Sequence, residues 1–185
     1  MLTTTLSQLH QLKLSGMAKA LSQQLEQPGQ YQDLCFAERL QLLTDQEIHE
    51  RDNRKQQRLL KQAQLKLAAN AHDIDYQHPR GLQKSVMTGL LKCDWLQRQQ
   101  NLLLTGPCGT GKTYIACALA NTACLKGYTV KYYRVSRLLM ELTQAKADGT
   151  YSKKLKSLAK LNLLILDDWG LEPLKAAQRN DLMEI

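Results

Sequence analysis

The sequence lacks the features that would place a protein in a membrane or outside the cell. No stretch approaches the roughly 18 uninterrupted apolar residues of a membrane-spanning helix. The N-terminal segment MLTTTLSQLHQLKLSGM has no basic region followed by an apolar block, so it does not resemble a secretory signal. Five cysteines without a C-x-x-C pair fit neither a disulfide framework nor a zinc site, and the four histidines show no metal-ligand spacing. These absences predict a cytoplasmic protein with reduced thiols and no membrane contact.

Acidic residues are also in short supply relative to basic ones. The chain has 25 Lys and Arg against 17 Asp and Glu, a formal charge of +8 and a pI near 9.3. This balance favours a polyanionic partner, although charge alone does not identify it. The length of 185 residues, 43% of them hydrophobic, suits one large domain or two small ones.

The N-terminal part of the chain is predicted to be all-α. Apolar residues recur at helical spacing, and a short helix is expected over 34–43. Thr44 and Glu47 have the spacing of a capping box, so another helix is expected to begin at Thr44 and to run to about Ala69. We therefore predict a helical region for DNA or partner contact over residues 1–72. A linker is predicted over 73–94.

From residue 95 onward, strands and helices are predicted to alternate. The expected strands are NLLLTG (101–106), YTVKYYR (128–134) and LNLLILDD (161–168). The expected helices are 112–126, ended by Gly127, and a helix capped by Ser136. This order is typical of a parallel α/β sheet, so residues 95–185 are predicted to form an α/β core.

The stretch GPCGTGKT, residues 106–113, matches the phosphate-loop pattern G-x-x-x-x-G-K-[ST] in full. Glycines let successive backbone N–H groups point at phosphates, and the following helix adds the positive end of its dipole. Lys112 would reach the β- and γ-phosphates, and the Thr113 hydroxyl would ligate Mg²⁺. A chance match is the alternative, but an expected strand before the loop and a helix after it favour the motif. The predicted ATP-binding residues are Gly106, Pro107, Cys108, Gly109, Thr110, Gly111, Lys112 and Thr113.

Two adjacent acids, Asp167 and Asp168, end the last aliphatic strand some 55 residues after the loop. A carboxylate at this place in a P-loop protein belongs near the magnesium ion, so Asp167 is predicted to hold the metal. Asp168 is predicted to orient or deprotonate the attacking water, which makes it, with Lys112, the predicted catalytic pair. The alternative is that one or both merely end a strand at the solvent.

Several stretches resemble the IstB family of AAA+ ATPases, which help the transposases of bacterial insertion sequences and are related to the DnaC helicase loaders. They are LHQLKLSGMAKAL, NLLLTGPCGTGKTYIACALANTAC, GYTVKYYRVSRLLMEL and ADGTYSKKLKSLAKLNLLILDDWGLEPL. The resemblance implies an α/β fold: a P-loop AAA+ core with a parallel sheet, preceded by an all-α region. It also implies ATP and Mg²⁺ as ligands, and duplex DNA, a transposase and further copies of the chain as partners. By the same resemblance, Arg80 and Leu82 would lie near the adenine; a simple turn at Pro79 and Gly81 is the alternative.

Proteins of this kind carry a further strand with a polar sensor residue, and an arginine that reaches the neighbouring subunit. The chain ends at RNDLMEI, before either, and Arg179 is too close to the acidic strand to take the arginine's role. In such sheets the sensor strand lies between the phosphate-loop strand and the acidic strand. The core is therefore expected to be incomplete at its C-terminus, as the fragment of an ATPase or the product of an interrupted gene.

Two basic stretches are candidates for DNA contact. In RDNRKQQRLLKQAQLK, basic residues recur every three or four positions, so one helix face could follow a phosphate backbone. These residues are Arg51, Arg54, Lys55, Arg58 and Lys61. A solvated helix face with ordinary pairs such as Glu47 with Arg51 is the alternative. The stretch KKLKSLAK, 153–160, is either a second DNA contact or a plain amphipathic helix.

The sequence therefore predicts an ATP-binding and ATP-hydrolysing DNA-binding protein that helps insertion-sequence transposition. A DnaC-like helicase loader is the first alternative. A non-hydrolysing DNA-binding remnant is the second, and hydrolysis by this chain is left open. A small-molecule P-loop kinase has no support, because no substrate-binding lid can be identified.

Overall fold

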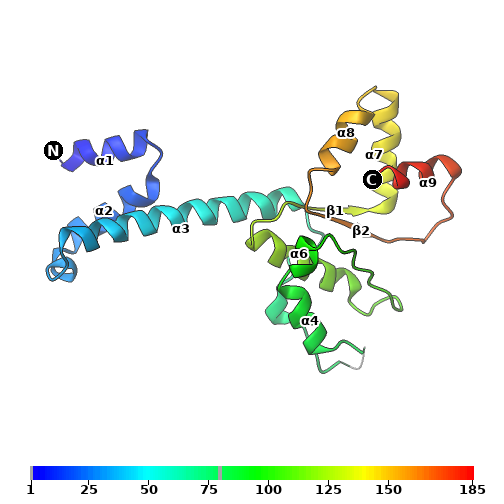
Figure 1. Cartoon of the computed structure of the whole chain (residues 1–185), viewed down its shortest axis with the longest axis horizontal. Helices are drawn as coiled ribbons and strands as arrows, with labels where there is room; N and C mark the ends of the chain where they lie inside the picture. The colour runs from blue at the N-terminus through cyan, green and yellow to red at the C-terminus, as the bar shows by residue number, and fades with distance from the viewer. Residues whose placement is uncertain (1, 79–80) are drawn as a thin grey trace. The chain divides into compact units, whose positions relative to one another are not determined.

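The computed structural model describes residues 2–78 and 81–185 as a mixed α/β protein that is mostly helical (Figure 1). Its chain order is α1 (Leu2–Gln11), α2 (Ser15–Glu26), η1 (Pro28–Tyr31), α3 (Phe36–Ala63), η2 (Ala71–Asp73), α4 (Lys84–Leu91), α5 (Asp94–Gln97), α6 (Lys112–Leu125), β1 (Val130–Arg134), α7 (Val135–Ala147), α8 (Tyr151–Leu158), β2 (Leu163–Asp167) and α9 (Ala176–Met183). The chain divides into two compact units, Met1–Gln57 and Arg58–Ile185. The functional division predicted at residue 72 stays a prediction.

In the first unit, α2 packs closely on α3. A Cβ at Gly16 would lie 2.6 Å from the Cα of Glu47 and 2.7 Å from the carbonyl oxygen of Gln46, so this approach requires glycine. The Glu47 carboxylate is 5% exposed and accepts hydrogen bonds from the backbone N–H groups of Gly16 (2.7 Å) and Met17 (3.2 Å). Those N–H groups belong to the first turn of α2 and have no partner within that helix. A carboxylate from α3 therefore caps α2.

The helix boundary predicted at Thr44 is wrong. Residues 36–63 form one continuous helix, and the Thr44 hydroxyl donates to the Gln41 carbonyl oxygen inside it (2.8 Å). Glu47, the supposed partner of Thr44 in a capping box, caps α2 instead. The capping-box spacing of Thr44 and Glu47 therefore occurred by chance. Glu47 caps a helix that begins about 31 residues earlier in the chain.

The second unit contains a two-stranded parallel sheet. Tyr132 is in register with Ile165, and Tyr133 with Leu166. Side chains alternate between the faces, as expected for strands. The face with Tyr132 and Ile165 packs on α6, and the face with Tyr133 and Leu166 packs on α7 and α8. Figure 1 shows these helices on opposite sides of β1 and β2. The parallel arrangement of these strands confirms that part of the prediction.

The strand predicted over 101–106 is not formed, because the sheet of the described residues contains only β1 and β2. An apolar run becomes a strand only where a neighbouring strand supplies ladder hydrogen bonds, and no described segment does so here. Leu103 is 83% exposed, whereas Leu104 packs against the cluster under α6. Ser136 does not cap α7 either. That helix begins at Val135 and has Arg134 as its N-cap, without a side-chain hydrogen bond.

Much of the predicted linker packs into the core of the second unit. Ile74, Met87 and Cys93 are buried there, with Ala69 from the segment that follows α3. The Asn121 amide on α6 donates to the Ala69 carbonyl oxygen (2.9 Å), which fastens this segment to the helix after the phosphate loop. Within residues 2–78 and 81–185, no helix is both long and apolar enough to cross a bilayer.

Candidate functional site

The phosphate loop ends in a turn that only its glycines accommodate easily. Gly109 and Gly111 have φ angles of 83° and 87°, in the left-handed region that L side chains rarely adopt. Gly111 is the N-cap of α6, so the free N–H groups of that helix begin directly at the loop. Backbone donors at a helix N-terminus suit phosphate oxygens.

Lys112 folds back over the loop. Its ammonium group donates to the carbonyl oxygens of Gly106 (2.8 Å) and Pro107 (2.7 Å). Both acceptors are neutral, so the positive charge remains available to an anion held by the same loop. The Lys112 ammonium therefore lies against the loop, and its binding of phosphate stays a prediction.

Thr113 and Asp167, 54 residues apart in the sequence, meet in the structure. The Thr113 hydroxyl on α6 donates to Oδ2 of Asp167 at the end of β2 (2.9 Å). A hydroxyl and a carboxylate are hard oxygen donors of the kind that Mg²⁺ prefers. In the described part of the chain, no three His, Cys, Asp or Glu side chains gather as a metal site. Mg²⁺ binding by Thr113 and Asp167 stays a prediction.

The Asp167 carboxylate has further partners besides the Thr113 hydroxyl. The Tyr132 hydroxyl on β1 donates to the same Oδ2 (2.5 Å), and the Lys66 ammonium lies 3.8 Å from it. Burial by itself raises the pKa of Asp167, but the hydrogen bonds from Tyr132 and Thr113, with help from Lys66, outweigh it and hold the pKa below its ordinary value. Burial and the Asp167 carboxylate raise the pKa of Tyr132, so its hydroxyl stays a donor. The carboxylate is ionised and ready for a cation.

Asp168 turns away from its neighbour. Its φ of 59° is left-handed, a conformation that aspartate tolerates better than most residues. Its carboxylate forms an ion pair with Arg134 at the end of β1 (3.4 Å). The two adjacent acids therefore have different partners, and water activation by Asp168 stays a prediction.

Tyr132, Lys66 and Arg134 are the site residues that sequence reasoning missed. Tyr132 is 8% exposed, and its hydroxyl donates to the Asp167 carboxylate. The signal for Arg134 was its place at the end of the strand before α7, because the ends of parallel strands share one edge. Lys66 is the last residue of the basic stretch RDNRKQQRLLKQAQLK, but nothing in the sequence indicated that it lies beside Asp167.

The predicted base pocket is only partly described. Leu82 is half-buried against the cluster that contains Ile74, Met87 and, from α6, Ile115. Arg80 and Pro79 lie outside the described residues. The role of Leu82 beside an adenine stays a prediction.

The predicted DNA-contacting residues have different electrostatic surroundings. In the first unit, Arg51 and Arg54 pair with Glu47 at 2.7 Å and 3.6 Å, which agrees with the alternative of an ordinary helix pair for Arg51. Lys55 is exposed there. In the second unit, Arg58 and Lys61 are exposed, and neither forms an ion pair with any described residue.

Comparisons with known proteins extend these observations. The family model described as IstB-like ATP binding protein matches residues 7–185. A protein described as ATP-binding in insertion sequence IS1162 of Pseudomonas fluorescens is 48% identical over 182 residues, 98% of this chain and 78% of that protein. An insertion-sequence protein of Sinorhizobium fredii, also described as ATP-binding, is 42% identical over 98% of this chain and 74% of its own length.

A more distant relative fits the same pattern. The protein described as ATP-binding in insertion sequence IS21 of Pseudomonas aeruginosa is 30% identical over 166 residues, 90% of this chain and 62% of that protein. These matches span both structural units and include the phosphate loop and the acidic pair. The resemblance predicted from the sequence is thus confirmed, and the chain belongs to the family of IstB-like ATP binding proteins of insertion sequences.

Proposed function

We propose that this chain binds and hydrolyses ATP with Mg²⁺ and acts as a DNA-binding helper of transposition. The observation that carries the nucleotide part is the hydrogen bond between Thr113 and Asp167 beside a glycine loop that also holds Lys112. It brings the phosphate-binding and metal-binding groups of a P-loop AAA+ ATPase to one place. The family's insertion-sequence relatives support the setting in transposition.

The residues divide the work by their chemistry. The loop N–H groups and Lys112 would bind phosphate oxygens, and Thr113 and Asp167 would hold Mg²⁺, which supplies neutralisation of phosphate charge. Asp168 would orient or deprotonate the water molecule that attacks the γ-phosphate. The Asp168 carboxylate is paired with Arg134, so it would act on water either from within that ion pair or after leaving it.

The first experiment is thermal unfolding of the chain with and without MgATP. ATP at about a hundred times its dissociation constant should stabilise the wild type by roughly 2.7 kcal/mol. Lys112→Ala should abolish this shift. Lys92→Ala is the matched control, because Lys92 is an exposed lysine of the same unit whose side chain makes no hydrogen bond or ion pair with the described residues. An ATP shift that survives in Lys112→Ala would contradict the assigned site.

Hydrolysis is tested separately from binding. Asp168→Asn should keep the ATP-dependent shift and lose phosphate release. Turnover by the wild type would exclude a non-hydrolysing remnant, whereas binding without turnover would favour it. Equal turnover in Asp168→Asn and wild type would remove Asp168 from the catalytic residues.

The partners are duplex DNA, a transposase of the same element and further copies of the chain. Affinity capture with purified transposase and replicative helicase, offered in equal amounts with MgATP, separates the two settings. Retention of the helicase alone would replace transposition by helicase loading as the function.

A further inference from the structure

A basic hollow of ≈ 740 Å³ lies in the second unit and shares no residue with the phosphate loop. The last turns of α3, strand β1 and the end of α8 form its walls. Its lining includes the cationic side chains of Arg58, Lys61, Lys131 and Lys160. Arg58 and Lys61 come from one basic stretch of the sequence and Lys160 from the other, so folding brings the two stretches together.

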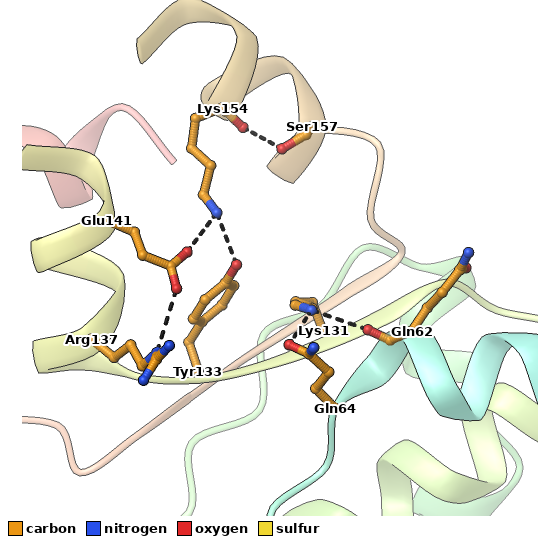
Figure 2. Close-up of polar contacts among 8 residues, drawn as sticks. All are labelled: Gln62, Gln64, Lys131, Tyr133, Arg137, Glu141, Lys154 and Ser157. Atoms are coloured by element: carbon orange, nitrogen blue, oxygen red, sulfur yellow. Dashed lines mark hydrogen bonds and ion pairs between the residues drawn. The ribbon is translucent and has the colours of Figure 1, made fainter. Parts of the chain in front are cut away.

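The positive charge of this hollow is not neutralised from within. Its lining contains no acidic residue. Arg58, Lys61 and Lys160 have no ion pair with any residue of the described part of the chain. Lys131 donates to the Gln62 carbonyl oxygen (3.2 Å) and to the Gln64 side-chain oxygen (2.7 Å), which are both neutral acceptors (Figure 2).

The neighbouring lysine is treated differently. Lys154 donates to the Glu141 carboxylate (2.7 Å) and to the Tyr133 hydroxyl (2.9 Å), as Figure 2 shows. Burial, and then the charge of Lys154, lower the pKa of Lys131. Lys154, outside the hollow, is thus paired with a carboxylate, whereas the four cations of the lining have no carboxylate partner among the described residues. A bound anion would neutralise them.

A second hollow of ≈ 510 Å³ continues the first. It is lined by Lys153, Lys156, Ser157 and Lys160, and it shares Ser157 and Lys160 with the larger one. Cations therefore follow one another from the end of α3, across β1, to the exposed face of α8. Such a row suits a chain of regularly spaced phosphates better than one small anion.

We propose that these two hollows, here called the basic groove, bind the phosphate backbone of DNA through Arg58, Lys61, Lys131, Lys153, Lys156 and Lys160. The proposal rests on the DNA-binding part of the proposed function and gives it a location. Tyr133, the aromatic residue of the lining, is 8% exposed and bonded to Lys154, so it offers no platform for a base. The groove therefore contacts phosphates and not bases, and its binding is independent of sequence.

The test measures duplex affinity by fluorescence anisotropy across a series of salt concentrations. The double variant Lys156→Gln/Lys160→Gln removes groove charges that lie outside the α3 stretch. If each lysine contacts one phosphate, the slope of log affinity against log salt concentration should become shallower by about 1.8. Affinity near 0.15 M salt should then fall by about 30-fold. Lys92→Gln/Arg98→Gln removes the same net charge from exposed positions of the same unit and should leave the slope unchanged.

A second double variant, Arg58→Gln/Lys61→Gln, approaches the groove from its other wall and should give the same loss. Circular dichroism and the MgATP-dependent thermal shift establish that each variant is folded. Equal losses in groove and control variants, or no loss in the groove variants, would overturn the groove. Wild-type protein that binds no DNA would overturn both the groove and the DNA part of the proposed function.

A final arm separates a polymer from a small anion. Pyrophosphate is added to the complex of duplex with Lys112→Ala, in which the phosphate loop is disabled. If pyrophosphate displaces the duplex only at concentrations at which its contribution to ionic strength accounts for the loss, the groove is supported as a site for the DNA backbone. Displacement at micromolar pyrophosphate would make it a small-anion pocket and overturn the proposal.

Discussion

Removal of the Glu47 carboxylate should loosen α2 far more than removal of a carboxylate one turn further along α3. Glu47 is 5% exposed and caps the first turn of α2 through Gly16 and Met17. It also accepts from Arg51 at 2.7 Å. In Glu47→Ala, the N–H groups at the start of α2 lose their acceptor in a place that water reaches poorly.

The magnitude follows from these contacts. Loss of a helix cap costs about 1 kcal/mol, and loss of a hydrogen bond to a charged acceptor costs about 1.5–3 kcal/mol. Removal of a buried charge returns part of this, because its desolvation is relieved. A net loss of about 2–3 kcal/mol is expected, which corresponds to a roughly 30- to 150-fold larger population of opened α2.

Hydrogen exchange of peptides from α2, read by mass spectrometry in the full chain, measures this opening directly. Glu50→Ala is the matched control, since it makes the same substitution in the same helix and keeps the change in helix propensity equal. Glu50, which is half-buried, pairs at 3.7 Å with the exposed Lys19, an interaction worth about 0–1 kcal/mol. Exchange in α2 that is equally fast in both variants would refute the capping role of Glu47.

Three further outcomes are expected. Gly16→Ala should destabilise the first unit by about 1–3 kcal/mol in urea unfolding, because its Cβ would meet the backbone of α3 at 2.6 Å; the exposed Gly29→Ala, whose Cβ meets nothing, is the control, and equal stability would contradict the close packing. Acid should weaken the first unit: burial raises the pKa of Glu47, but Arg51 and the α2 backbone lower it below its ordinary value. Its contribution is therefore complete above about pH 4.3 and is lost as the pH falls through the lowered pKa, so thermal unfolding between pH 6 and pH 3 should depend on pH less steeply in Glu47→Gln. Lys66→Met should raise the apparent Mg²⁺ affinity up to about fivefold, measured as Mg²⁺ titration of the ATP-dependent thermal shift, because Lys66 competes for Asp167 at 3.8 Å; unchanged affinity would show that it does not.

Local patterns in the sequence predicted the parts of the molecule that local chemistry determines. The phosphate loop, the helix after it and the stop at Gly127 all follow from residues within a few positions of one another. The parallel pairing of 130–134 with 163–167 followed from aliphatic runs on either side of a helical pattern. The strand over 101–106 failed because a strand requires a neighbour, and no sequence window contains that information.

The errors at Thr44 and Glu47 have the same origin. The spacing of a capping box was present, but a helix N-terminus also requires the chain before it to be non-helical, and residues from Phe36 onward are helical. Glu47 does cap a helix, although it caps one that is distant in sequence. The carboxylate of Glu47 thus has the capping role that its chemistry suggested, but the spacing from Thr44 indicated the wrong helix.

Asp167 shows that a motif can predict where a site lies without predicting the other side chains that contact it. The motifs assigned Thr113 and Asp167 to one magnesium ion, and the two side chains are hydrogen-bonded. The Asp167 carboxylate also accepts a hydrogen bond from Tyr132 on β1, and Lys66, from the segment after α3, lies close to it. Mg²⁺ that binds Asp167 must share that carboxylate with each of these groups, and a cation at the site repels the Lys66 ammonium. Lys66 lies on the segment that the Asn121 amide holds at Ala69, between the end of α3 and the buried Ile74. On the proposed function, a metal ion at Asp167 would therefore act on Lys66, which lies five residues after Lys61 of the basic groove.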